Sequence, residues 1–219
     1  MKILIATPAY GSQVYTQYTE SLVATCLMLK SLNIEFEIRF IGNQIVTRAR
    51  NMLSYIFLKD ESFTHLLFVD ADVCWNPLDV KKLLEHDLEC VIGVYPNKKY
   101  LIKNGTIGLN PSSVFSQPLV TKGENLVKVK YAATGFMLLN RVAFDRVKLY
   151  VDTFELPVSE GENATLYNFF DCNVVNGDYL TEDYYFSHLF NQFDGEIFAD
   201  KSIRLKHIGF HVYGEDLNV

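Results

Sequence analysis

The feature that most constrains the fold is the alternation of apolar segments with helical patterns over residues 1–95. The apolar segments span residues 2–7, 34–41, 65–70 and 89–95, and apolar residues recur at helical spacing over residues 15–31, 44–59 and 77–87. Strands that alternate with helices at this spacing are typical of a doubly wound sheet whose strands run mostly parallel. We therefore expect an α/β fold for this part of the chain.

The second part of the chain follows a different pattern. Residues 96–125 are polar and rich in Asn, Gly, Ser and Pro, which predicts a long loop or a small hairpin insertion. Strands are expected at 126–133 and 203–208, and a helix is expected at 181–193. These elements predict an α+β half attached to the same sheet. Because we find no repeat and no linker, we expect residues 1–219 to form one domain.

Composition and charge exclude several classes of protein. The net charge of -6 leaves no basic surface that would bind nucleic acid or an anionic membrane. No segment is long and apolar enough to span a bilayer or to act as a secretory signal. The four cysteines are widely spaced without a C-x-x-C pair, which favours reduced thiols in the cytoplasm over a zinc site or disulfides.

Two aspartates follow a buried strand in the segment HLLFVDADVCW, residues 65–75. Asp70 and Asp72 lie at the carboxyl end of the strand, where open α/β sheets bind their ligands. Paired carboxylates suit Mg²⁺ or Mn²⁺, but both can reach one ion only if the backbone turns at Ala71, since alternate residues of a strand point to opposite faces. A solvated loop that caps the next helix, which Asn76 and Pro77 begin, is the alternative.

A histidine follows another expected strand, in the segment KHIGFH near the carboxyl end of the sequence. If His207 joins the two aspartates, the neutral imidazole favours Mn²⁺ over Mg²⁺. A histidine with a purely structural role is the alternative.

Six short motifs occur in an order that resembles GT-A fold glycosyltransferases, in particular compact viral or bacterial members. The motifs are TPAYG, TRARN, LLFVDADV, TGFMLLNR, TEDYYF and KHIG. The resemblance covers most of the chain except residues 96–125 and about 148–165. It implies a nucleotide-binding half at 1–95 and an acceptor-binding half at 96–219.

The resemblance implies a metal-dependent enzyme. Such an enzyme moves a hexosyl or deoxyhexosyl group from a UDP- or GDP-sugar to a hydroxyl of a glycan or glycoprotein acceptor. By similarity Asp72 ligates Mn²⁺ or Mg²⁺, Asp70 contacts the ribose or reaches the ion through water, and His207 is a further ligand. The ion then assists the departure of the nucleoside diphosphate.

The same resemblance implies residues that bind the nucleotide sugar. They are Thr7, Pro8, Tyr10, Arg48, Asn51, Asp70, Ala71, Thr134 and Gly135. Gln44, Arg48 and Asn51 form one stripe of a helix, from which Arg50 points away, so we favour Arg48 as the diphosphate or sugar contact. For the residues of TPAYG the alternative is a plain strand-to-helix turn. For Arg48 it is a solvated helical arginine, and for Gly135 it is a structural glycine in a strand bulge.

On the acceptor side the resemblance implies that Asp183 is the general base, with Glu182 bonded to a sugar hydroxyl. Trp75 and Tyr184 are expected to contact the acceptor. Acidic residues in a first helical turn also stabilise the helix dipole, and most aromatic side chains belong to a core, so both assignments have structural alternatives.

Two other functions stay open at this level. A sugar-1-phosphate nucleotidyltransferase shares the sheet, but TPAYGSQ lacks the cation expected in its glycine-rich loop. A glycosyltransferase-like domain that binds carbohydrate without turnover is the second. Either stereochemical outcome of transfer fits the sequence, and the chain is compatible with one part of a longer multi-enzyme polypeptide.

Overall fold

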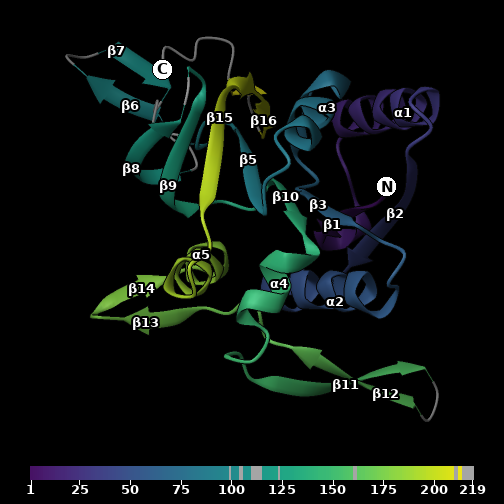
Figure 1. The fold of residues 1–219 in the computed structure, drawn as a ribbon. Helices are drawn as coiled ribbons and strands as arrows, with labels where there is room; N and C mark the ends of the chain where they lie inside the picture. Colours follow the sequence, from purple (N-terminus) through teal and green to yellow (C-terminus); the bar gives the residue numbers. More distant parts are fainter. Residues whose placement is uncertain are drawn as a thin grey trace.

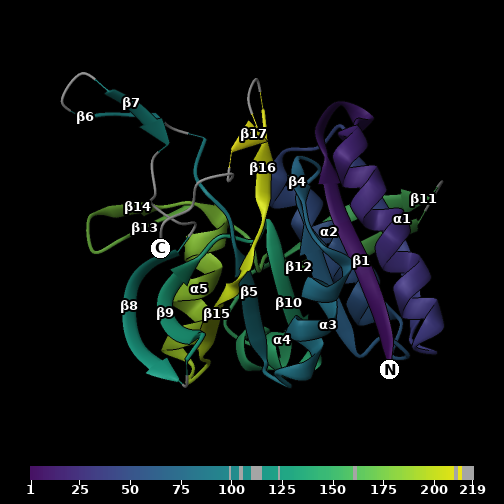
Figure 2. The ribbon, with the colours of Figure 1, turned by 90° about the horizontal axis from the view of Figure 1, so that it is seen from above.

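A computed structural model describes residues 1–98, 100–103, 106–109, 115–122, 124–159, 162–209 and 212–213. An eight-stranded sheet forms its middle layer, and helices cover both faces (Figures 1 and 2). The strands of this sheet, in spatial order, are β2 (Glu35–Gly42), β1 (Lys2–Ala9), β3 (His65–Val69), β10 (Phe136–Asn140), β5 (Cys90–Val94), β15 (Ile197–Arg204), β9 (Leu126–Ala132) and β8 (Phe115–Lys122). All of them except β10 and β9 run in one direction, so the expected mostly parallel α/β sheet is confirmed.

Two groups of helices cover the two faces of the sheet. The helices are α1 (Thr16–Ser31), α2 (Val46–Lys59), α3 (Pro77–Glu85), α4 (Arg141–Val147) and α5 (Glu182–Gln192), and a 3-10 turn, η1, spans Tyr10–Ser12. Along β1, Leu4 belongs to the core under α2, α4 and α5, whereas Ile3 and Ile5 belong to the core under α1 and α3. This alternation is the two-residue period of a strand buried on both faces. The helix expected from Asn76 and Pro77 is confirmed as α3, with a complete capping box.

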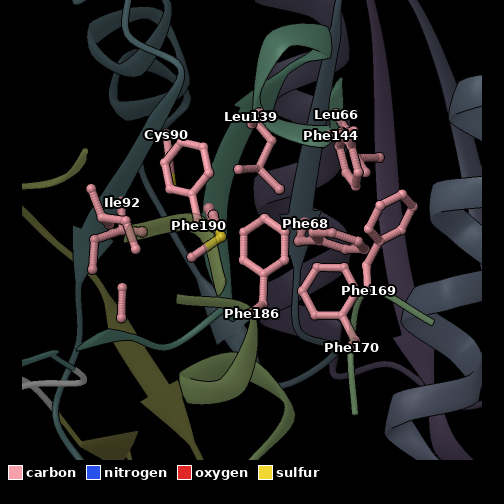
Figure 3. Close-up of a cluster of buried hydrophobic side chains, with 14 of the residues drawn as sticks. Leu66, Phe68, Cys90, Ile92, Leu139, Phe144, Phe169, Phe170, Phe186 and Phe190 are labelled. Carbon is pink, nitrogen blue, oxygen red and sulfur yellow. The ribbon is translucent and has the colours of Figure 1, made fainter. Parts of the chain in front are cut away.

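Phenylalanines dominate the core under α2, α4 and α5. Phe186 of α5 stacks on Phe170, with ring centroids 4.7 Å apart, and Phe144 of α4 packs edge-on against Phe169 (Figure 3). All four rings are at most 1% exposed. Buried aromatic side chains contribute the largest apolar areas in a core, so this cluster fixes where α5 begins.

The second half of the chain contributes strands to the main sheet, and one of them lies between two strands of the first half. β10 lies between β3 and β5 and runs antiparallel to both, whereas β15 continues the parallel direction beside β5. The expected α+β half is therefore present, as is the strand expected at 126–133. The strand expected at 203–208 is wrong in its bounds. β15 begins at Ile197, and the chain bulges between Asp200 and Arg204 before it enters a different sheet.

Small sheets and hairpins surround the main sheet. They are β4 (Val73–Cys74) with β16 (Lys206–Ile208) and β17 (Val212–Tyr213), β6 (Tyr100–Lys103) with β7 (Thr106–Leu109), β11 (Thr153–Ser159) with β12 (Glu162–Tyr167), and β13 (Asn173–Val175) with β14 (Asp178–Leu180). The hairpin expected within 96–125 is β6–β7. Residues 115–122 differ from the expected loop, because β8 pairs with β9 at the edge of the main sheet.

Helix α1 turns only some of its apolar residues towards the sheet. Val23 and Leu27 are 54% and 66% exposed, while Tyr18, Leu22 and Leu29 face the sheet. Tyr18 packs its ring against Trp75, 5.3 Å away, which turns its side of the helix inward. Within the described residues, no helix combines the length and the apolar character that crossing a bilayer requires.

Candidate functional site

A cleft of about 1130 Å³ opens at the carboxyl ends of β1, β3 and β5. It is lined by Pro8, Tyr10, Gln13, Val14, Tyr15, Thr16, Gln44, Ile45, Val46, Arg50, Asp70, Ala71, Asp72, Tyr95, Ala133, Thr134, Glu182 and Asp183. This is the edge at which open α/β sheets bind ligands. The first turn of α5 closes the cleft opposite the aspartates, so residues from both halves of the chain meet there.

The backbone turns directly after β3. The Val73 N–H donates to the Asp70 carbonyl over 3.1 Å, so the backbone does turn at Ala71. The Asp70 N–H donates to the Gly135 carbonyl over 3.0 Å, and this bond ties the turn to the residue before β10. Asp70 and Asp72 thus both line the cleft, but each has a different partner.

Asp70 is paired with an arginine that lies inside the protein. Arg50 is 3% exposed, and its Nη2 donates to Asp70 Oδ1 over 2.9 Å while its Nε donates to Glu182 Oε1 over 3.3 Å. Burial alone would lower the pKa of Arg50, but the charges of Asp70 and Glu182 outweigh it and raise the pKa. The Nη1 atom is buried and has no hydrogen-bond partner among the residues that the structure describes.

Asp72 lies between an imidazole and an ammonium group. His207 Nε2 is 3.4 Å from Asp72 Oδ1, and Lys98 Nζ donates to Asp72 Oδ2. Burial raises the pKa of Asp72, but hydrogen bonds from His207 and Lys98 outweigh it, so the pKa lies below its ordinary value. His207 Nδ1 lies 3.0 Å from the Pro96 carbonyl, which can only accept, so Nδ1 carries a proton.

Strand pairing brings His207 from the end of the described chain to the aspartates. β16 pairs antiparallel with β4, which places His207 opposite Val73. The Ile208 N–H donates to the Asp72 carbonyl over 2.7 Å. Because β4 follows the turn at once, the same backbone bonds fix the positions of Asp72 and His207.

Gly135 forms a wall of the site at a point of close approach. A Cβ atom there would lie 2.7 Å from Tyr95 Cζ and 2.8 Å from Asp70 Oδ2, so no larger residue fits without movement. The Gly135 N–H donates to Tyr95 Oη over 3.0 Å. Next to it, Thr134 Oγ1 is buried without a hydrogen-bond partner in the described part of the chain. The close approach of Tyr95 and Asp70 therefore accounts for a glycine at this position.

Asp183 occupies the first turn of α5. Thr181 Oγ1 and the Tyr184 N–H, the latter over 2.8 Å, both donate to the same oxygen, Oδ1. Burial raises the pKa of Asp183, and the neighbouring charge of Glu182 raises it further. A carboxylate with a raised pKa is a stronger base than an ordinary one.

The structure brings most of the expected residues together, but not all of them. Pro8, Tyr10, Asp70, Ala71, Asp72, Thr134, Glu182 and Asp183 line the cleft, and Gly135 and His207 contact lining residues. Thr7 is fully buried, and its hydroxyl lies 2.6 Å from that of Tyr18. It therefore belongs to the core rather than to the cleft.

The expectation for helix α2 is wrong, because the arginine expected to point away is the one in the cleft. Arg50 and Val46, one turn apart, line it together. Arg48 is exposed and faces a separate pocket beside β11. Asn51 is 2% exposed and holds the backbone at Phe170, whose N–H donates to its Oδ1 over 2.9 Å, so its role is structural.

The expected acceptor contacts also differ from the structure. Trp75 is only 7% exposed, and its indole N–H donates to Thr25 Oγ1 over 2.8 Å, so it is a core residue. Tyr184 stacks on Tyr131 with ring centroids 5.0 Å apart. Neither ring lines the cleft.

Among the direct partners of the aspartates and of Gly135, three residues were not expected from the sequence: Arg50, Tyr95 and Lys98. Tyr95 and Lys98 belong to the segment YPNK, which follows β5 just as the aspartates follow β3. The rule that led to Asp70, applied to the next parallel strand, would have found them. Arg50 has no such signal, because its partners lie 20 and 132 residues away in the sequence.

The chemistry of the side chains decides which residues of the site could hold a divalent ion. Within the described residues, no three His, Cys, Asp or Glu side chains are grouped closely enough to hold a metal ion together. Asp72 and His207 do fit as a pair of ligands. Because Nδ1 carries a proton, the neutral form of the ring has its free lone pair at Nε2, and Nε2 lies 3.4 Å from Asp72 Oδ1. Asp70, held by Arg50, does not join them.

Comparison with known proteins identifies the fold. No model of a protein family matches the sequence, and no curated protein matches it. The protein A197 from STIV superposes with a TM-score of 0.56 at 16% identity, over 99% of this chain and 95% of that one. A crystal structure of GalNAc-T7 with UDP, GalNAc and Mn²⁺ superposes with a TM-score of 0.52 at 11% identity, over 95% of this chain and 44% of that one. The chain has a GT-A fold. At these identities the likeness concerns the fold alone.

Proposed function

We propose that the chain is a metal-dependent glycosyltransferase that moves a monosaccharide from a nucleoside-diphosphate sugar to a hydroxyl of a glycan or other acceptor. One observation carries the proposal. Asp72 and His207 face each other at 3.4 Å in a cleft at the carboxyl ends of parallel strands, with the imidazole oriented by Pro96. A carboxylate and an oriented imidazole are a ligand pair that suits Mn²⁺.

In this proposal Asp72 and His207 hold the ion, while Asp70 serves the site through Arg50. When bound, the ion supplies Lewis-acid stabilisation of the charge that develops on the departing nucleoside diphosphate. Arg50 lies next to this position with a buried, unpartnered Nη1 among the described residues, which suits a phosphate or sugar oxygen of the donor. Thr134, whose hydroxyl is likewise buried and unpartnered in the described part of the chain, suits a donor hydroxyl.

The nucleoside is assigned to the part of the cleft that the end of β1, η1 and the start of α2 line. Pro8 and Tyr10 line it there, and Tyr10 is 84% exposed, so its ring is accessible for stacking on a base. Ile45 and Val46, 70% and 40% exposed, provide apolar surface from the start of α2. Exposed apolar side chains that gather in a cleft are typical of a binding site.

Asp183 is assigned as the general base that takes the proton of the acceptor hydroxyl. One of its oxygens accepts both of the described hydrogen bonds, and the raised pKa strengthens it as a base. Glu182 cannot share this role, because it is paired with Arg50. A base positioned opposite the leaving group favours inversion at the anomeric carbon.

Thermal-shift screening of UDP- and GDP-sugars, with and without Mn²⁺, tests the proposal. We expect one donor to raise the melting temperature only when Mn²⁺ is present, since a ligand at about 100 times its Kd adds about 2.7 kcal/mol to the free energy of unfolding. Asp72→Asn should abolish the Mn²⁺-dependent part. The matched control Asp145→Asn, on exposed α4 surface, should keep it.

Product analysis separates the proposed function from its rivals. Release of a nucleoside diphosphate with transfer to an acceptor, or slow transfer to water, supports a glycosyltransferase. Donor-dependent stabilisation without any turnover indicates a carbohydrate-binding domain, and formation of a nucleotide sugar from a sugar phosphate indicates a nucleotidyltransferase. Either of the last two results would contradict the proposal.

A further inference from the structure

The aspartates of the cleft are both paired with cations of the protein, but the two pairs differ in burial. The Arg50 side chain is 3% exposed and is held at two points, by Asp70 and by Glu182. The Lys98 side chain is 31% exposed, and Asp72 is the partner that the structure records for it. A buried, doubly held guanidinium is costly to move, whereas a half-exposed lysine on a flexible stem is not.

Lys98 competes with a metal ion for the same carboxylate. Both oxygens of Asp72 are engaged, Oδ1 facing His207 and Oδ2 accepting from Lys98. A divalent ion on Asp72 would meet an ammonium group within one side chain's reach, and like charges at such distances repel strongly. Binding of the ion and binding of Lys98 to Asp72 therefore weaken each other.

A displaced Lys98 has one obvious destination. It follows β5, at the same end of the sheet as Arg50, so its stem is anchored beside the cleft. The donor proposed above brings a diphosphate to this position, and lysine binds phosphate well as a point charge. The movement would exchange one anionic partner for another without leaving Lys98 unpaired.

We propose that Lys98 is a built-in counter-ion for Asp72, which the divalent ion displaces onto the diphosphate of the donor. This inference rests on the proposed function. The ion and the donor then bind cooperatively. The ion frees Lys98 for the diphosphate, and the diphosphate keeps Lys98 away from Asp72. Without a donor, Lys98 weakens ion binding and neutralises the charge of Asp72.

The test measures Mn²⁺ binding to the full chain by electron paramagnetic resonance of the free ion, without nucleotide. We expect Lys98→Met to bind Mn²⁺ about threefold to tenfold more tightly than the wild type, since a competing, partly exposed ion pair is removed. With Mn²⁺ saturating, the same variant should bind UDP or GDP about tenfold more weakly, since a charged phosphate contact is lost. Lys128→Met, which removes a surface pair with Glu196, should change neither affinity.

The possible outcomes distinguish this inference from the proposed function. If wild type and Lys98→Met bind Mn²⁺ equally tightly, and Asp72→Asn does not bind it, the metal site stands and the role of Lys98 is overturned. Equal weakening of Mn²⁺ and nucleotide binding by Lys98→Met would overturn it too, as this indicates a merely structural lysine. If neither protein binds Mn²⁺, the metal dependence itself falls, and the counter-ion role with it.

Discussion

At the residue scale, Asp183 is a carboxyl group that the protein makes costly to ionise. It is largely buried, and the charge of Glu182 lies next to it in the sequence. Two hydrogen bonds to one oxygen offset only part of that cost. Groups held in such surroundings are frequent in active sites because the raised pKa serves acid–base chemistry.

The variant Asp183→Asn should lose catalysis while it gains stability. We expect transfer to fall about 10²- to 10⁴-fold, the usual contribution of a general base. Because the folded pKa lies above the ordinary 3.8, the folded protein binds this proton more tightly than the unfolded chain. The wild type should therefore lose stability relative to Asp183→Asn as the pH rises above about 4. Thermal unfolding of both proteins between pH 4 and 8 checks this, and a constant difference would contradict it.

Gly135 is a second residue whose environment allows a sharp prediction. Gly135→Ala should lower the melting temperature and weaken nucleotide binding, because the added methyl group meets Tyr95 and Asp70. Overpacking of this kind costs about 1–3 kcal/mol. The cost should be smaller in a Tyr95→Phe background, which removes the atom nearest to the new methyl group. Equal costs in both backgrounds, by denaturant unfolding, would argue against this contact.

At the element scale, helix α2 carries two arginines two residues apart in different environments. Arg50→Met should destabilise the protein by about 3–5 kcal/mol, because it leaves Asp70 and Glu182 as unpaired, partly buried carboxylates. Arg48→Met, on the exposed side of the same helix, should change the free energy of unfolding by less than about 0.5 kcal/mol. Denaturant unfolding measures both, and similar effects would refute the different roles given to them.

The same helix shows what could and could not be predicted from the sequence. Its existence and approximate ends follow from apolar periodicity, which depends only on local spacing. The choice between Arg48 and Arg50 does not, because a buried arginine is recognised by its distant partners, Asp70 and Glu182. Asn51 lies on the same stripe as Arg48 and therefore favoured the wrong arginine. Its side-chain oxygen accepts a hydrogen bond from the Phe170 N–H and does not bind a ligand.

Strands at the carboxyl side were harder to predict than helices for a related reason. β8 has no continuous apolar run and gains its place from pairing with β9. β15 contains a bulge between Asp200 and Arg204 that no local pattern marks, and β16 then pairs in a different sheet. In contrast, Asp70 and Asp72 could be found because they follow the apolar strand β3, and the cleft at a sheet's carboxyl end is a general property of the fold. His207 could be found as a chemically distinctive residue, although it lies within β16 and not after a strand.

At the scale of the whole molecule, the site rests on the phenylalanine core shown in Figure 3. Phe186 lies one turn beyond Glu182 and Asp183 and is fully buried. Phe186→Ala should therefore cost about 3–5 kcal/mol of stability and weaken donor binding as α5 loosens. Leu149→Ala, at an 80% exposed position, is the control and should be close to neutral. Calorimetry measures the first effect and titration with the donor the second; a destabilised variant with unchanged donor affinity would show that α5 is held by other contacts.

The two halves of the chain are also expected to depend on each other. A fragment of residues 1–95 contains β3 and β5 but lacks β10, the strand that joins them. We expect the fragment to show no cooperative unfolding by circular dichroism and no protected amides in hydrogen exchange. A fragment that unfolds cooperatively would mean that the first half can close its sheet in another order.

The place of β10 also bears on how the molecule is made. β3 and β5 are synthesised well before β10 (Phe136–Asn140), which pairs with both of them. The edges that β10 will cover therefore stay unpaired while the middle of the polypeptide is translated. Unpaired apolar edges are where nascent chains stick to one another. Synthesis of this molecule therefore passes through a vulnerable interval that chaperones would have to cover, and it ends when a single late strand arrives.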